Sequence, residues 1–417
     1  MSYNDNIIFK KIKKLKHVLI IMIKIIINSK FNLYIPQKTD ILIADKKSGK
    51  EAINLFFHQY KCEYLHTRLD EINIYVLIIT LIKYKFKELS KNYIKCMIEI
   101  REPKIIFCLH ENNWALYKTK YKKYKYKLII AQMAVMYGES CNYYYENKDK
   151  LFACDYFLNH SKHSKQFLGE LIDTKYLNVG SFKLNSYLAD LPDQGDTGVC
   201  FISQYRGGKG INTVKNPVMK KPIEYAYKLV SKICKDYNII LSIALASSRI
   251  DKTFEKKKEI KFYKDIYHDF KYSDESSYKF AIKSNTIVCM NSTLGLELVS
   301  IGYKVLFLDT LISLARKSNT LEKHTYKENE KKYNRPDKPV RFSNYFSYYY
   351  GNDGEFWDEG IEHKNVEEKI NKLYKMDGKE WRSIYKKYTL PIQYFDSNNS
   401  KLKEIIDGHI SDYISVK

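Results

Sequence analysis

The chain has 417 residues, which is long enough for two domains. Of these residues, 45% are hydrophobic and 15% aromatic, a composition that excludes a disordered polypeptide. The formal net charge of +23 is compatible with nucleic acid, anionic lipid or an anionic substrate as a partner. Lysine far outweighs arginine, whereas base readout and stacking favour arginine, so nucleic acid is the least favoured of these partners.

The eight cysteines are scattered and form no CxxC pair. Several lie in apolar runs such as IIFCL at residues 105–109, which is typical of buried free thiols in a reducing cytoplasm. His160 and His163 lie in a polar loop without a matching carboxylate cluster. We therefore expect no metal site.

Residues 1–35 form a basic N-terminal segment whose apolar residues are interrupted by Lys10, Lys11, Lys13, Lys14, Lys16 and Lys24. Its uncharged core, Val18–Ile23, is too short to span a bilayer. Two interpretations are open. The segment is a first helix packed on the domain, or it lies on an anionic membrane surface and places a cytoplasmic protein on the inner face of the cell membrane.

Residues 36–190 form the first of two predicted α/β domains. The expected helices are Ser48–Tyr60 and one or two within Tyr75–Ile98, and the expected strands are Ile41–Asp45, Lys104–Leu109, Lys127–Gln132, Cys154–Leu158 and Tyr176–Val179. Buried-looking strands that alternate with helices indicate a parallel sheet covered on both faces. The stretch Leu188–Gly198, rich in Pro, Gly and Asp, is the predicted linker.

Residues 198–345 predict a second α/β domain, and residues 346–417 a helical tail with helices at Val366–Met376 and Gly378–Tyr388. The expected elements of the second domain include helices Pro222–Asp236 and Ser276–Lys283, strands Val199–Ser203 and Asn238–Ala246, and a weak strand Lys261–Tyr263. Strand Thr286–Met290, helix Leu294–Ile301 and strand Val305–Leu308 then form a βαβ unit. The predicted fold class is α/β, with two Rossmann-like domains facing a cleft.

The turn Asn291-Ser292-Thr293 of this βαβ unit offers N–H groups and hydroxyls at a helix start, where a phosphate is favoured. If Thr293 is the N-cap, the capping-box position is Leu296, so Glu297 is not needed as a cap partner. A free carboxylate beside such a turn suggests a nucleotide, with its phosphate on the turn and its ribose on Glu297. The alternative is a solvent-facing glutamate on an ordinary helix.

Other polar groups also fall at the predicted carboxyl ends of strands, where ligands bind in open α/β sheets. SQYRGGKG at residues 203–210 combines glycines with Arg206 and Lys209, which suits a phosphate, although it is not a Walker A loop. HENN at residues 110–113 pairs an imidazole with a carboxylate, which suits a general base or a stabiliser of a cationic transition state. The alternatives are an ordinary surface loop and ordinary exposed polar residues. His66 with Arg68, and Asp155, are weaker candidates.

Seven segments together resemble those of bacterial surface carbohydrate biosynthesis proteins, glycosyltransferases of the GT-B type. They are AQMAVMYGE (131–139), DYFLNHSKHSKQFL (155–168), VGSFKLN (179–185), FISQYR (201–206), NSTLGLELVSIGYKVLF (291–307), GEFWDE (354–359) and KEWRSIYKKY (379–388). A more distant similarity is to bacterial transferases of Kdo-type sugars, which use CMP-activated donors. The chain departs from the family's usual pattern at His110-Glu111-Asn112, where an aspartate is common, and at Gln132-Met133-Ala134, where a Gln-Asn-Gly-like turn is common.

The resemblance implies a metal-independent GT-B-like glycosyltransferase of capsule or lipopolysaccharide synthesis. It would move a sugar from a nucleotide-activated donor, CMP-linked or other, to a growing polysaccharide or lipid-linked glycan, with the nucleotide sugar as substrate and no cofactor. His110 or Glu111 would be catalytic, and the donor would contact Ser203, Gln204, Arg206, Ser247, Arg249, Asn291, Ser292, Thr293 and Glu297. The alternatives are transfer of a polyol phosphate from a CDP-linked donor, and a non-enzymatic basic protein that binds membrane or nucleic acid.

Overall fold

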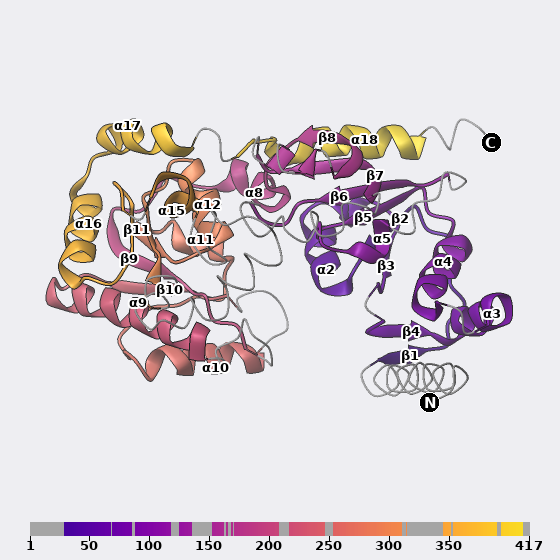
Figure 1. Ribbon diagram of the computed structural model, residues 1–417, viewed down its shortest axis with the longest axis horizontal. Coiled ribbons are helices and arrows are strands. Elements are labelled where there is room, and N and C mark those ends of the chain that lie inside the picture. Colours follow the sequence, from indigo (N-terminus) through magenta and orange to yellow (C-terminus); the bar gives the residue numbers. More distant parts are fainter. Residues whose placement is uncertain are drawn as a thin grey trace, which may run out of the picture.

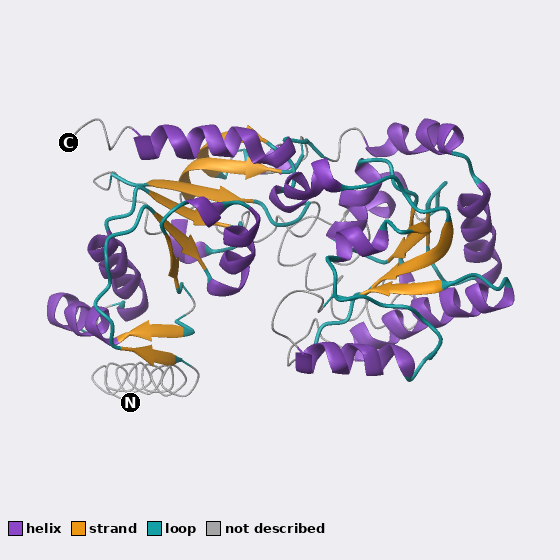
Figure 2. Ribbon diagram, turned by 180° about the vertical axis from the view of Figure 1, so that it is seen from behind, coloured by secondary structure: helices purple, strands orange, loops and turns teal. Residues whose placement is uncertain are grey.

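The computed structural model consists of two α/β domains that lie side by side (Figures 1 and 2). Most of the basic N-terminal segment, together with Ser247 and Arg249, lies outside the part of the chain that the structure describes. The described residues are 29–67, 69–85, 88–117, 125–135, 152–161, 164–165, 168–169, 171–207, 217–246, 253–310, 314, 345–351, 353–389 and 393–411.

The N-terminal domain is built on a six-stranded sheet with the order β3-β2-β5-β6-β7-β8, in which every neighbouring pair is parallel. The central strands are runs of fully buried apolar residues without alternation, as expected when helices cover both faces of a sheet. The strands are β2 (Ile41–Ala44), β3 (Cys62–Leu65), β5 (Ile105–Cys108), β6 (Lys127–Ala131), β7 (Phe152–Asn159) and β8 (Ile172–Asn178). The helices along this sheet are α2 (Lys46–Leu55), η1 (Phe57–Gln59), α5 (Trp114–Tyr117), α8 (Phe182–Tyr187) and η3 (Leu188–Asp190).

A small subdomain lies at one end of this domain, at the lower right of Figure 1. Strands β1 (Lys30–Asn32) and β4 (Glu71–Asn73) form a parallel pair, and helices α3 (Ile74–Tyr84) and α4 (Leu89–Arg101) pack against each other. Asn73 is the N-cap of α3, because its side-chain oxygen accepts the N–H of Val76 at 3.0 Å. One or two helices were expected over Tyr75–Ile98, and the structure has two, α3 and α4.

The C-terminal domain has a five-stranded parallel sheet with the order β10-β9-β11-β12-β13. Its strands are β9 (Thr197–Ile202), β10 (Leu241–Ala244), β11 (Ser284–Cys289), β12 (Val305–Leu308) and β13 (Trp357–Asp358). Its helices are α9 (Pro217–Asp236), α10 (Thr253–Lys264), α11 (Ser277–Ala281), α12 (Thr293–Ser300), α15 (Tyr345–Tyr350), α16 (His363–Lys375) and α17 (Gly378–Thr389). The predicted fold class, with two Rossmann-like parallel-sheet domains, is confirmed.

The prediction of a strand at Lys261–Tyr263 is wrong, because these residues belong to α10. Glu259 and Tyr263 are both fully buried. Residues four positions apart lie on one face of a helix. A run of three residues is too short to reveal that spacing.

The end of the chain returns to the N-terminal domain. Residues 345–389 pack on the C-terminal sheet, whereas η5 (Ser397–Asn399) and α18 (Ser400–Ser411) pack along the N-terminal domain, where Figure 1 shows α18 beside β8. Leu402 and Ile406 are buried in one core cluster with Ile41 and Phe57. The segment expected as one helical tail is thus divided between the two domains.

The VGSFKLN segment holds this returning chain in place. Asn185 is fully buried; its amide donates to the carbonyl of Val179 at 2.8 Å and to Asn399 Oδ1 at 3.0 Å, and its oxygen accepts the N–H of Asp396 at 3.0 Å. Gly180 has a φ of +79°, and a Cβ there would lie 1.7 Å from the carbonyl oxygen of Tyr394. Only glycine fits this position, because it combines a left-handed conformation with backbone contact.

We expect Asn185→Ala to lower the free energy of unfolding by about 3 kcal/mol, because it leaves buried backbone and side-chain groups unpaired. It should also expose the segment after Thr389 to protease. Urea denaturation and limited proteolysis measure the two effects. The matched control is Asn365→Ala on the exposed side of α16. Equal proteolysis of the two variants would contradict this role for Asn185.

Candidate functional site

The carboxyl edge of the N-terminal sheet carries a row of polar side chains that faces the other domain. Asp45 directly follows β2, and Gln132 and His160 directly follow β6 and β7. His110 comes two residues after β5. Val135, four residues beyond β6, is buried in the core cluster of the C-terminal domain. This edge therefore lies at the junction of the domains, where open parallel sheets bind ligands.

Glu111 is built into this edge. Its Oε2 accepts the N–H of Met133 at 2.7 Å, and its backbone carbonyl accepts the hydroxyl of Tyr117 at 3.0 Å. Burial of the carboxyl group raises its pKa above the ordinary value, although the residue is only half-buried overall. A carboxyl with a raised pKa is protonated more readily than an ordinary one, which suits a group that takes up and releases a proton in acid–base catalysis. His110 is half-buried beside it, and its carbonyl accepts the N–H of Asn113 at 3.3 Å.

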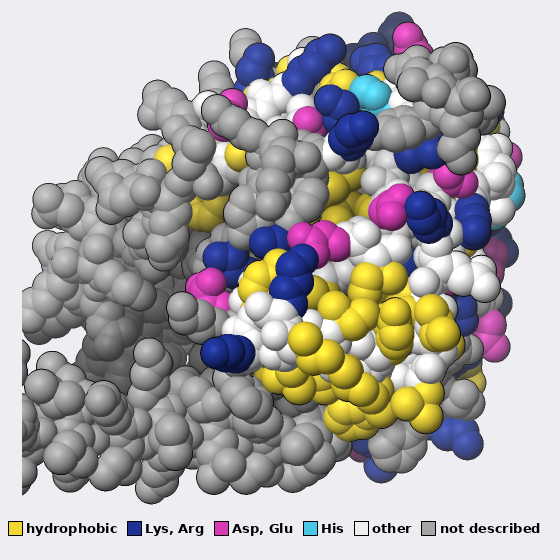
Figure 3. Space-filling view, turned by 90° about the vertical axis from the view of Figure 1, so that its right-hand side faces the viewer, with side chains coloured by type: hydrophobic (Ala, Val, Ile, Leu, Met, Phe, Trp, Pro, Cys, Tyr) yellow, Lys and Arg dark blue, Asp and Glu magenta, His cyan; other side chains and the backbone are white. Residues whose placement is uncertain are grey.

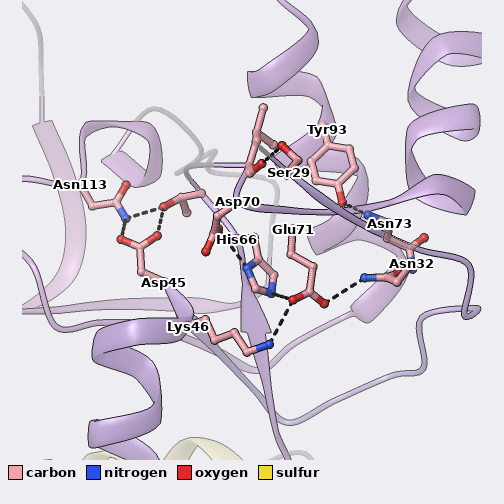
Figure 4. Close-up of polar contacts among 12 residues, drawn as sticks. Ser29, Asn32, Asp45, Lys46, His66, Asp70, Glu71, Asn73, Tyr93 and Asn113 are labelled. Carbon is pink, nitrogen blue, oxygen red and sulfur yellow. Dashed lines mark hydrogen bonds and ion pairs between the residues drawn. The ribbon is translucent and has the colours of Figure 1, made fainter. Parts of the chain in front are cut away.

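Asp45 also lies at this edge, and it was not among the site residues predicted from the sequence. Its backbone φ is +61°, which is rare for a residue with a side chain. Its buried carboxylate accepts the Thr67 hydroxyl at 2.7 Å and the Asn113 amide at 3.4 Å, and that amide also donates to Thr67 Oγ1 at 2.8 Å (Figure 4). Strained residues of this kind cluster at functional sites. Asn113 of the HENN segment therefore joins the same sheet edge as His110 and Glu111, through its contact with Asp45.

A second polar group surrounds His66 in Figure 4. The buried ring of His66 has Nδ1 at 3.1 Å from Asp70 Oδ1 and Nε2 at 3.8 Å from Glu71 Oε2. Glu71 also accepts Lys46 Nζ at 3.1 Å and the Asn32 amide at 3.0 Å. These contacts connect β1 and β4 with the end of β3. Arg68, which was a weaker candidate together with His66, lies outside the described residues.

His160 and Gln132 join the ends of β6 and β7. The N–H of His160 donates to Gln132 Oε1 at 3.0 Å, and its Nε2 donates to the Gln132 carbonyl at 2.9 Å. Burial lowers the pKa of His160 to about 4, so the ring is neutral at physiological pH. The carbonyl of His160 accepts the N–H of Tyr394 at 2.7 Å. This histidine therefore supports the returning tail.

At the carboxyl edge of the C-terminal sheet, Ser203 is directed inward. Its hydroxyl donates to Glu259 and lies 2.9 Å from the Tyr263 hydroxyl, and Glu259 also accepts the N–H of Ala246 at 2.8 Å. This network fixes the ends of β9 and β10. Gln204 is half-buried and Arg206 is exposed, so both are accessible at this edge.

The start of α12 is accessible and tightly positioned. Asn291 is exposed, Ser292 and Thr293 are half-buried, and the N-cap Ser292 makes no side-chain capping bond. Gly295 lets the helix lie close to the sheet, because a Cβ there would be 2.4 Å from Cys289 Sγ and 3.2 Å from a Phe307 ring carbon. The first-turn N–H groups of this helix have no partner within the helix, which suits an anion.

Glu297 differs from the expected free carboxylate. It is 2% exposed, and its Oε2 accepts the hydroxyl of Tyr278 on α11. The ring of Tyr278 stacks on Tyr187 with centroids 5.0 Å apart. Because α12 is apolar on nearly all sides, it is buried, and a glutamate within it requires a donor.

Among the described residues, no group of three or more His, Cys, Asp and Glu side chains is placed to hold a metal ion. The seven cysteines with a described position are free thiols. The described helices also include none that is long and apolar enough to cross a membrane.

A protein-family profile described as "putative O-antigen biosynthesis protein" matches residues 136–410, about two thirds of the chain. The chain belongs to this family. The match covers the N-terminal domain from β7 onward, the C-terminal domain and the returning tail, and it confirms the resemblance to surface carbohydrate biosynthesis proteins. The comparison with curated proteins found no match.

Three solved structures illustrate the likeness to known folds. The wall teichoic acid polymerase TagF is 11% identical, with 90% of this chain and 89% of that chain covered and a TM-score of 0.48. UDP-GlcNAc 2-epimerase from Methanocaldococcus jannaschii is 10% identical, with 88% and 99% covered and a TM-score of 0.46. Sucrose-phosphate synthase from Thermosynechococcus elongatus is 9% identical, with 90% and 100% covered and a TM-score of 0.43.

The raised pKa of Glu111 predicts a pH-dependent effect of Glu111→Gln. In the wild type, the folded state binds the proton more tightly than the unfolded state, so this stabilising contribution is lost as the pH rises through the folded pKa. Glutamine keeps an acceptor for the N–H of Met133 and does not titrate. We therefore expect the variant to gain stability relative to wild type from pH 4 to pH 8, as measured by thermal unfolding. A difference that is constant with pH would contradict the shift.

We expect Gly295→Ala to lower the free energy of unfolding by about 2 kcal/mol, because the new Cβ pushes α12 away from β11 and β12. Gly408→Ala on α18 is the matched control, since nothing lies within 4 Å of its added Cβ. That change should stabilise by about 0.5 to 1 kcal/mol through helix propensity. Chemical denaturation of both variants measures the contrast, and similar values for the two would contradict the close contact of α12.

Proposed function

We propose that the protein is a glycosyltransferase that moves a sugar from a nucleotide-activated donor to a surface polysaccharide or lipid-linked glycan. Membership of the O-antigen biosynthesis family supports this class of product. The observation that carries the proposal is the pair of parallel sheets with polar side chains at the carboxyl edge of each, together with Val135, which follows β6 and is buried in the core cluster of the C-terminal domain. Such a junction holds two substrates against each other, which a transfer reaction requires.

The donor belongs, in this proposal, on the C-terminal domain. Its phosphates would bind the start of α12, with Ser292 and Thr293 as hydroxyl donors and Asn291 beside them. Arg206 is an exposed cation in the described residues that follow β9, and it would offset phosphate charge. Gln204 would also line the donor site, together with Ser247 and Arg249. Ser203 would act through the network that positions this edge, because its hydroxyl bonds Glu259.

The acceptor belongs on the N-terminal domain, where His110 or Glu111 would handle the proton. In sugar transfer the bond between the anomeric carbon and the donor phosphate breaks, the acceptor oxygen bonds the anomeric carbon, and the nucleotide leaves with its phosphate. The step passes through an oxocarbenium-like state, in which a base removes the proton of the acceptor hydroxyl and a carboxylate stabilises the positive charge. Glu111 fits the proton-handling role through the raised pKa of its carboxyl. Asp45 fits the electrostatic role, since a strained backbone and two donors hold its carboxylate at this edge.

Calorimetry with CMP, CDP, UDP and GDP compounds tests the donor site. We expect one nucleotide to bind, and Arg206→Gln to weaken its binding about tenfold through loss of a charged contact. The matched control is Arg382→Gln on the exposed face of α17, which should leave binding unchanged. No binding of any nucleotide would overturn the proposal. Turnover of a CDP-linked polyol without sugar transfer would replace it with polyol phosphate transfer.

The same titrations decide the role of Glu297. If its carboxylate reaches the ribose, Glu297→Ala should weaken binding while Tyr278→Phe leaves it unchanged. If Glu297 only joins α11 to α12 through Tyr278, the two variants should have matching effects on affinity and on thermal stability.

A further inference from the structure

Seven large hydrophobic side chains are exposed together on the small subdomain of the N-terminal domain. Figure 3 shows this end of the molecule, where hydrophobic side chains form a continuous area with Lys, Arg, Asp and Glu side chains around it. The members of this apolar patch range from 41% to 78% exposed; they are Phe31, Leu33, Tyr34, Ile35, Tyr75, Ile78 and Ile82. Exposed apolar areas of this kind mark sites that contact proteins or membranes.

The patch is part of the folded structure. Phe31 lies opposite Ile72 in the register of β1 and β4. The Asn73 amide donates to the carbonyl of Tyr34 at 2.7 Å, and the hydroxyl of Tyr34 accepts Arg101 Nη2 at 3.1 Å. On α3, Val76 and Thr80 are buried while Tyr75, Ile78 and Ile82 are exposed. The subdomain therefore holds these apolar side chains outward.

The segments that carry the patch are basic, and carboxylates of the neighbouring helix α4 and the residue after it pair with two of their lysines, Lys83 with Glu99 and Lys38 with Glu102, each at 2.7 Å. Residues 30–38 and 74–85 contain four lysines and no aspartate or glutamate. The segment that precedes them in the chain adds Lys10, Lys11, Lys13, Lys14, Lys16 and Lys24, against one aspartate, Asp5. Apolar side chains bordered by lysine complement the interface of a membrane with anionic headgroups.

We propose that the apolar patch inserts into the headgroup region of an anionic lipid bilayer and holds the N-terminal domain on the membrane surface. Helix α3 has 11 residues, which is too few to cross a bilayer, so it would lie along the surface. The inference goes beyond the proposed transferase activity and does not depend on it, because lipid binding requires neither donor nor acceptor.

Vesicle flotation of the full chain tests the proposal, with phosphatidylcholine vesicles alone or mixed with phosphatidylglycerol. Wild type should float with the anionic vesicles, and less at high salt because screening weakens the lysine contribution. The double variant Ile78→Glu with Ile82→Glu should reduce the floating fraction about tenfold or more, because it removes apolar contact and adds repulsion. Ile240→Glu is the control: Ile240 and Ile78 are each 51% exposed, and Ile240 lies in the C-terminal domain.

Each other outcome overturns the proposal in a defined way. Full flotation of the double variant would place attachment elsewhere, and replacing the six lysines between Lys10 and Lys24 by glutamine would then show whether that part of the chain is responsible. Equal flotation on uncharged vesicles would overturn the anionic preference. Absence of flotation, with a dimer that the double variant abolishes in size-exclusion chromatography with light scattering, would assign the patch to a second copy of the chain. Thermal unfolding of the double variant, compared with wild type, verifies its fold without relying on the donor site.

Discussion

The return of the chain end to the N-terminal domain is the constraint on which the arrangement of both domains depends. After α17 has packed on the C-terminal sheet, residues 393–399 cross back, bond Asn185 and His160, and lie against the backbone of Gly180. The linker and this returning segment therefore join the domains twice. Two connections restrict the relative motions of two domains far more than one, and here both lie beside the carboxyl edge of the N-terminal sheet. The segment VGSFKLN, which resembles a family signature, is explained by this anchoring.

The parallel arrangement of the strands explains why polar side chains gather at one edge of the N-terminal sheet. Parallel strands present all their carboxyl ends at one edge, so residues distant in sequence, such as Asp45, Glu111 and Gln132, line one margin of the sheet. Their backbone groups are left without ladder partners at this edge, and side chains satisfy them, as Glu111 does for Met133. The polar network thus stabilises the edge of the sheet and places polar and titratable side chains at the domain junction.

The strands and most helices could be predicted because buried parallel strands are short apolar runs, and this signal is local. The site was less accessible to prediction. The positive φ of Asp45 depends on partners 22 and 68 residues away, and nothing in ILIAD indicates it. Glu297 was expected to be free because its neighbours in sequence offered no partner, whereas Tyr278 reaches it from another helix. Ser203 was expected to face a ligand, and its inward bond to Glu259 again comes from a distant helix.

The two proposals together assign different tasks to the two domains. The apolar patch and the acceptor-side edge both belong to the N-terminal domain, whereas the start of α12 and Arg206 belong to the C-terminal domain. An acceptor anchored in a bilayer is confined to its surface, so the domain that binds it gains from being held there as well. A nucleotide-activated donor is soluble, and the domain that binds it needs no membrane contact. This division accounts for the location of the large exposed apolar side chains, which are concentrated on the subdomain farthest from the C-terminal sheet in Figure 1.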